Sequence, residues 1–186
     1  MSDLNELAAS AAEAPVVRAI RPGDKAHWAR LFVAYGVFYE TAFTQEIVDN
    51  VFERLVGHSG EIDALVATDA DDRLIGFAHF RQQYDTFTGG PGWFLDDLYV
   101  EPAARGAGAA TALIETLSEL ATASGGGTLR WITAADNATA QRVYDRVATR
   151  TSWVTYEKDL VTEPSDDQDN IHDHAHAHDH DNQGHN

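Results

Sequence analysis

The sequence contains no cysteine. This excludes disulfide bonds, thiolate metal sites and a cysteine nucleophile. No apolar run approaches the roughly 18 residues that a membrane-spanning helix needs. Residues 1–14 are acidic and lack the basic segment that begins a secretory signal peptide. These absences predict a cytoplasmic protein with no membrane partner.

Positive charge is scarce, because 13 Lys and Arg stand against 30 Asp and Glu and the formal net charge is −17. Seven of the acidic residues follow residue 160, so the rest of the chain still carries about −10. Such a surface repels nucleic acid and attracts cations. We therefore expect no nucleic-acid partner and a cationic amine, polyamine or basic peptide as ligand. Acidity that serves only solubility or salt adaptation is the alternative.

The composition changes after residue 160. Residues 161–186 contain no aromatic residue but hold six of the nine histidines, which is typical of a disordered segment. We expect a flexible N-terminus (1–14), one domain (15–160) and a disordered, acidic, His-rich tail (161–186). Alternating histidines of the tail are chemically suited to a divalent metal ion such as Zn²⁺. These residues are His172, His174, His176, His178 and His180.

Residues 93–120 organise the chain. Their pattern predicts a strand over residues 94–100, an end to that strand at Pro102, and a glycine-containing turn at 105–108. A long helix follows, with one apolar stripe. The stripe consists of Ala110, Leu113, Ile114, Leu117 and Leu120.

The turn at residues 105–108 has the features of an anion site. A strand that enters a helix through small residues leaves helix N–H groups facing open space, and these groups favour an anion. Gly106 and Gly108 allow close approach of a ligand, and Arg105 adds a permanent cation. The motif is neither a P-loop nor GxGxxG, and a tight turn that binds nothing is the alternative.

Apolar periodicity predicts the remaining elements. Strands are expected over residues 16–20, 62–68, 74–81, 128–133 and 153–160. Helices are expected after the capping residues Asp24 and Thr44 and over residues 137–148. His79 lies in a strand; packing is its usual role, but imidazole chemistry near neutral pH keeps it as a catalytic candidate.

Two segments resemble one known family. Residues 105–110, RGAGAA, resemble the Q/R-x-x-G-x-G/A signature of the GNAT acyltransferases, which bind the pyrophosphate of acetyl-CoA. Residues 133–147 resemble the family's second cofactor segment, and the resemblance covers residues 16–160. It implies an α/β (α+β) GNAT fold: a mixed central sheet of about six to seven strands, flanked by about four helices and splayed between strands 4 and 5. The usual Leu-Gly-Phe turn is missing at 146–153.

The resemblance implies acetyl-CoA as co-substrate and no required metal. In the family, the pantetheine arm enters the gap between the splayed strands, and the turn holds the pyrophosphate. The residues carried over for cofactor binding are Leu98, Tyr99, Val100, Arg105, Gly106, Ala107, Gly108, Ala109, Ala110, Asn137, Ala140 and Tyr144.

Acetyl transfer to an amine needs a base, because an alkyl ammonium of pKa near 10.4 has no free lone pair. Asp96 and Asp97 are the candidates, and they resemble the acids of polyamine N-acetyltransferases. Neighbouring strand residues point to opposite faces unless a bulge intervenes, so the pattern does not choose between them. The resemblance implies Tyr144 as general acid and a backbone N–H near Leu98 or Tyr99 for the oxyanion. Structural roles for Tyr144 and both aspartates are the alternatives.

We therefore predict an N-acetyltransferase that moves an acetyl group directly to a primary amine of a small cation, an amino acid or a basic peptide. Tyr35, Tyr39 and Asp96 are the residues expected to contact this acceptor. A homodimer is expected from the family. A catalytically silent acyl-CoA sensor and a metal-handling protein that acts through its tail are the alternatives.

Overall fold

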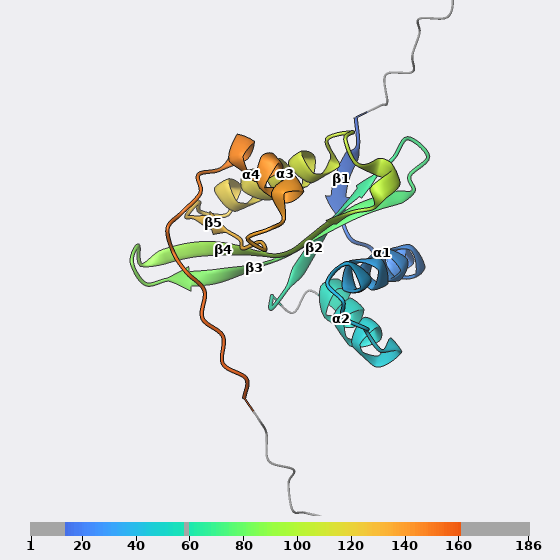
Figure 1. Ribbon diagram of the computed structural model, residues 1–186, viewed down its shortest axis with the longest axis horizontal. Helices are drawn as coiled ribbons and strands as arrows, with labels where there is room; N and C mark the ends of the chain where they lie inside the picture. The colour runs from blue at the N-terminus through green and yellow to red at the C-terminus, as the bar shows by residue number, and fades with distance from the viewer. Residues whose placement is uncertain (1–13, 58–59, 161–186) are drawn as a thin grey trace, which may run out of the picture. The chain divides into compact units, whose positions relative to one another are not determined.

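A computed structural model describes residues 14–57 and 60–160. Its strands are β1 (Val16–Ala19), β2 (Asp63–Thr68), β3 (Leu74–Asp85), β4 (Gly90–Val100) and β5 (Leu129–Arg130). Its helices are α1 (Lys25–Phe38), α2 (Gln45–Gly57), α3 (Ala109–Ala123) and α4 (Ala138–Val147), with short 3₁₀ turns η1 (Pro22–Asp24) and η2 (Pro102–Ala104). The strands form one sheet in chain order, antiparallel except for the parallel pair β4–β5 (Figure 1). No helix in these two ranges has the length and apolarity of a membrane span.

Helices cover both faces of the sheet, α1 and α2 on one face and α3 and α4 on the other (Figure 1). Successive strand residues alternate between the two cores, as Val66 packs with α1 and α2 while Leu65 packs with α3. Trp28 and Leu117 are fully buried in the respective cores. Each buried side chain of this size contributes about 1.5–3 kcal/mol, so the two layers hold β4 firmly between them.

A β-bulge in β4 decides which way its aspartates point. Asp97 pairs with His79 across the β3–β4 ladder, but Leu95 pairs with the next residue, Phe80, so Asp96 has no partner of its own. The extra residue shifts the alternation of side chains along the strand. Asp97 consequently turns toward α1, on the face opposite to the one where Leu95 is buried.

β4 and β5 pair only briefly before they separate. The ladder consists of Trp93 with Leu129 and Phe94 with Arg130, whereas β4 continues to Val100. The edge of β4 beyond the ladder is therefore left without a strand partner on the β5 side. The expected splay between strands 4 and 5 is confirmed.

The sheet has fewer strands than expected. The strand expected over residues 128–133 is only two residues long. The strand expected over 153–160 is wrong, because residues 151–160 carry no regular secondary structure and belong to a second unit of the chain, 151–186. A strand is stable only when a neighbour accepts and donates its ladder hydrogen bonds, which β-propensity along the sequence does not supply.

Candidate functional site

A pocket of about 340 Å³ opens where α1, β4, the start of α3 and α4 converge. It brings together three segments that are far apart in the sequence. The lining residues are Tyr35, Phe38 and Tyr39; Leu98, Tyr99 and Val100; Ala104, Arg105, Gly106, Gly108, Ala109, Ala110 and Thr111; and Asn137, Thr139, Ala140, Val143, Tyr144 and Arg146. Every residue predicted to bind cofactor is in this set except Ala107, and so are the predicted acceptor contacts Tyr35 and Tyr39. Asp96 and Asp97 are not.

The N-terminus of α3 faces the pocket through a turn that requires glycine. Gly106 and Gly108 have φ of 88° and 87°, the left-handed region, and no atom lies within 4 Å of where a Cβ would stand on either. The first N–H of α3 that closes on a carbonyl is that of Ala112, which donates to Gly108 O at 2.9 Å. The N–H groups of residues 109–111 therefore have no partner within the helix, which leaves them available to an anion.

Two arginines add positive charge to the pocket. Arg105 donates from Nε to Val100 O at 3.2 Å, which ties its guanidinium to the end of β4. Arg146 lines the pocket from α4, three residues after Val143. Both side chains keep N–H donors suited to phosphate oxygens.

α4 presents Tyr144 to the pocket. Asn137 caps the helix, because its Oδ1 accepts from Ala140 N at 3.1 Å. The Tyr144 ring packs edge-on against Trp131, with the ring centroids 5.4 Å apart. Burial, with a smaller contribution from Tyr39, raises the pKa of Tyr144 to about 12. The hydroxyl is thus a proton donor throughout the neutral range.

Asp97 ends a chain of buried hydrogen bonds that runs from the α1 core to the pocket. Its Oδ1 accepts from the Tyr35 hydroxyl at 2.6 Å, and its Oδ2 lies 2.8 Å from His79 Nδ1. Trp28 Nε1 donates to His79 Nε2 at 2.9 Å, and His79 is 0% exposed. An indole N–H only donates, so Nε2 is the acceptor and Nδ1 carries the proton given to Asp97. We call these four residues the Trp28–Asp97 network.

Opposing effects act on the ionisation of Asp97. Burial disfavours its charge, but the hydrogen bonds from His79 and Tyr35 outweigh burial and hold the pKa of Asp97 below its ordinary value. Burial and the hydrogen bond to Asp97 raise the pKa of Tyr35. The pair is therefore an ionised carboxylate that accepts from a neutral phenol.

Asp96 has a different environment. It forms an ion pair with Arg81 of β3, and Arg81 also stacks over Phe94 with its guanidinium carbon 5.0 Å from the ring centroid. Burial raises the pKa of Asp96, although Arg81 opposes that shift. Of the two aspartates, Asp97 is the one that contacts a pocket-lining residue.

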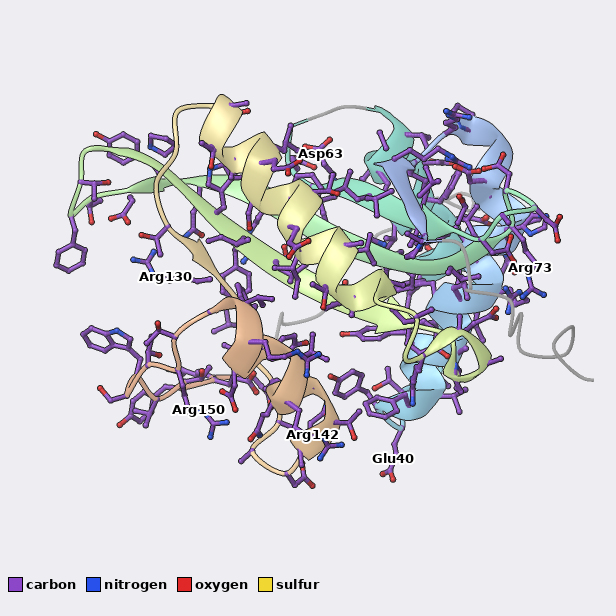
Figure 2. All side chains as sticks on the ribbon, turned by 90° about the horizontal axis from the view of Figure 1, so that it is seen from above. Glu40, Asp63, Arg73, Arg130, Arg142 and Arg150 are labelled. Atoms are coloured by element: carbon purple, nitrogen blue, oxygen red, sulfur yellow. The ribbon has the colours of Figure 1, made fainter. Side chains whose placement is uncertain are left out.

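At the far end of β4, Arg130 of β5 lies 3.5 Å from the buried carboxylate of Asp85 on β3 (Figure 2). Asp85 Oδ1 also accepts from Phe87 N at 2.9 Å. This contact joins the short β5 to the β3–β4 hairpin before β4 and β5 separate toward the pocket.

The model of the acetyltransferase (GNAT) family matches residues 28–148. The chain belongs to the GNAT family. It is 31% identical over 144 residues to the D-amino-acid N-acetyltransferase HPA3 of Saccharomyces cerevisiae, a match that covers 77% of this chain and 89% of the relative. The chain is therefore an acyltransferase.

Solved GNAT structures share the fold. A ribosomal-protein-alanine N-acetyltransferase from Brucella melitensis superimposes with a TM-score of 0.68 at 24% identity, over 79% of this chain and 100% of that one. The aminoglycoside N-acetyltransferase AAC(6')-Iy, solved in complex with CoA, gives 0.67 at 21% identity, over 79% and 95%. At this level of identity the likeness concerns the fold alone.

Sequence reasoning missed three residues of this GNAT site. Arg146 shares a helical face with Val143, and that i, i+3 spacing was the available signal. Trp28 and His79 are 51 residues apart, and no local pattern links them. In residues 14–57 and 60–160, no cluster of three or more His, Cys, Asp or Glu is suited to a metal ion. The tail histidines predicted to hold metal, His172 to His180, lie outside these ranges.

Proposed function

We propose that this chain transfers the acetyl group of acetyl-CoA to a primary amine, and that the pocket holds both substrates. The observation that carries the proposal is that one cavity joins the open edge of β4, the N-terminus of α3 and the inward face of α4. An elongated thioester with a charged diphosphate needs these three features together: an edge, an anion site and a polar group at the reacting end.

In this proposal the diphosphate of acetyl-CoA binds at Gly106, Gly108 and the first N–H groups of α3. Arg105 and Arg146 add charge-assisted hydrogen bonds to its phosphates. The pantetheine arm lies along residues 98–100, whose backbone groups beyond the β4–β5 ladder are free for strand-like pairing. The thioester then lies near Tyr144 and the tyrosines of α1.

The reaction proceeds by attack of the neutral amine on the thioester carbonyl. A backbone N–H near Leu98 or Tyr99 stabilises the oxyanion, and the C–S bond then breaks. The ammonium loses two protons in all, one to the departing sulfur and one to solvent. With a pKa of about 12, Tyr144 does not give its proton outright to a thiolate whose conjugate acid has a pKa near about 8.5. Its role is to donate a hydrogen bond to the sulfur as charge develops there.

The acceptor class follows from charge and from the curated relative. A formal net charge of −17 favours a cationic amine, such as a polyamine or a basic peptide. The similarity to a D-amino-acid N-acetyltransferase adds amino acids to the acceptors that we propose.

Calorimetry of the full chain tests the cofactor half of the proposal. We expect acetyl-CoA and CoA to bind with micromolar Kd, because the phosphate interactions are shared by both. Thiol release with spermidine, cadaverine, D- and L-alanine and a lysine-containing peptide then tests the acceptor half. Absence of binding at millimolar acetyl-CoA would contradict the proposed function, whereas binding without turnover on any amine would favour an acyl-CoA sensor.

A further inference from the structure

The Trp28–Asp97 network leaves its one pocket-facing atom with a defined chemical role. The network begins in the α1 core at Trp28 and ends at Tyr35, which lines the pocket. The only proton on the Tyr35 hydroxyl is donated to Asp97 at 2.6 Å. What Tyr35 retains for a ligand is an oxygen lone pair, so it accepts a hydrogen bond and does not donate one.

Asp97 itself is poorly placed to act directly. Both of its oxygens already accept a hydrogen bond, from Tyr35 and from His79, and Asp97 is not among the residues that line the pocket. Its side chain is nevertheless 25% exposed, so a proton that reaches the carboxylate has a route to water. His79 has no such route, because it is fully buried and its Nε2 accepts from Trp28.

We propose that Tyr35 accepts a proton from the acceptor amine while it passes its own hydroxyl proton to Asp97, and that His79 and Trp28 are positioning residues for the carboxylate. This inference rests on the proposed function. It assigns the acceptor-side base to a tyrosine of α1 acting through Asp97, and it identifies the acceptor group as an N–H donor that is charged when it enters.

The step balances without any further reactant. One N–H bond of the ammonium breaks and its electron pair remains on nitrogen as the lone pair that attacks the thioester. A new O–H bond forms at Tyr35 while its former O–H bond breaks, and that proton forms an O–H bond at Asp97. Asp97 then releases the proton to water and is ionised again, which its hydrogen bond from His79 favours.

Several titratable groups face Tyr35 from the surrounding elements, and each belongs in the reading of its pH behaviour. They are Tyr39 on α1, Asp97 and Tyr99 on β4, and Tyr144 on α4, with His79 of β3 behind Asp97. The only carboxylate in this set is Asp97, so the direction of proton transfer away from the amine is toward β4.

The first test compares Tyr35→Phe with Asp97→Asn, using whichever amine of the panel above the wild-type chain acetylates. We expect each variant to lower kcat/KM for the amine about 100-fold at pH 7 and to leave the Kd of acetyl-CoA unchanged. The double variant should also lose about 100-fold, since the two residues act as one unit. Tyr84→Phe, on the exposed part of β3 outside the pocket, is the matched control and should retain full activity.

The pH dependence separates proton removal from mere packing. The free amine fraction in solution rises about 100-fold between pH 7 and pH 9 for an alkylamine. A variant that reacts only with free amine recovers over this range, so the Tyr35→Phe deficit should shrink to less than 10-fold at pH 9. A packing defect would persist at every pH.

Nitrogen NMR of the histidine rings tests the positioning residues. In the wild type we expect His79 to carry its proton on Nδ1, with a far-downfield proton signal that moves upfield in Asp97→Asn. Trp28→Phe should shift the same signal and lower kcat while the KM for acetyl-CoA stays unchanged.

The outcomes separate the two proposals. Tyr35→Phe at wild-type rates, a deficit that does not change with pH, or a double variant whose losses multiply to about 10⁴-fold would overturn the relay alone. A wild-type chain that neither binds acetyl-CoA nor acetylates any amine would overturn the proposed function and the relay with it. Thermal unfolding of each variant shows whether it is folded, and the histidine NMR reports on the network even where kcat is lost.

Discussion

Valine in place of Gly108 should weaken acetyl-CoA binding at least about 100-fold and abolish turnover at ordinary acetyl-CoA concentrations. Gly108 precedes α3 with φ of 87°, and its missing Cβ faces open space at the pocket. A branched side chain there would occupy the volume in front of the helix N–H groups. It would also oppose the left-handed backbone, at a cost of about 1–2 kcal/mol. Loss of two phosphate hydrogen bonds of about 1.5–3 kcal/mol each is enough for the predicted effect.

Gly126→Val is the matched control for this change. Gly126 follows the other end of α3, has φ of 76°, and likewise has no atom within 4 Å of a Cβ position, but it does not line the pocket. Both variants carry the same kind of backbone strain, so equal loss of stability is expected. If calorimetry gave Gly108→Val the acetyl-CoA affinity of the control, the turn would not be the phosphate site.

Tyr144→Phe should lower kcat by about 10- to 100-fold and leave the Kd of acetyl-CoA within about two-fold. The substitution keeps the ring that packs against Trp131 and removes only the hydroxyl. A hydrogen bond to a developing thiolate contributes about 1.5–3 kcal/mol, which converts to this range of rates. A larger loss is not expected, because a phenol of pKa about 12 is a hydrogen-bond donor rather than a strong acid. Single-turnover release of CoA thiol measures the effect.

The raised pKa of Tyr144 also predicts the alkaline behaviour of the enzyme. The reactive form is the neutral phenol, which is present below the pKa and is lost only as the pH rises through about 12. The wild-type kcat at saturating amine should therefore show no decline due to Tyr144 below about pH 10. A decline with a midpoint near pH 8–9 that is missing from Tyr144→Phe would show that the hydroxyl ionises far more readily than its burial implies.

Local sequence alone predicted the parts of the site that depend on neighbours in the chain. The turn at residues 105–110 was predictable, because glycine permits a positive φ and a helix N-terminus always leaves unpaired N–H groups. The cap at Asn137 and the position of Tyr144 seven residues later were predictable for the same reason, since helix geometry spans only a few residues. The absence of cysteine excluded thiol chemistry with no structure at all.

Tertiary structure decided which aspartate reaches the site and what holds it there. The bulge that turns Asp97 toward Tyr35 arises from pairing between β3 and β4, and it leaves Asp96 with Arg81. The His79 contacts to Asp97 and Trp28 join residues 18 and 51 positions away from it in the chain. Local periodicity carries no information about such pairs, because packing of separate elements brings them together. The extent of β5 was equally a matter of which neighbours pair, whereas the anion-binding turn was already encoded in six consecutive residues.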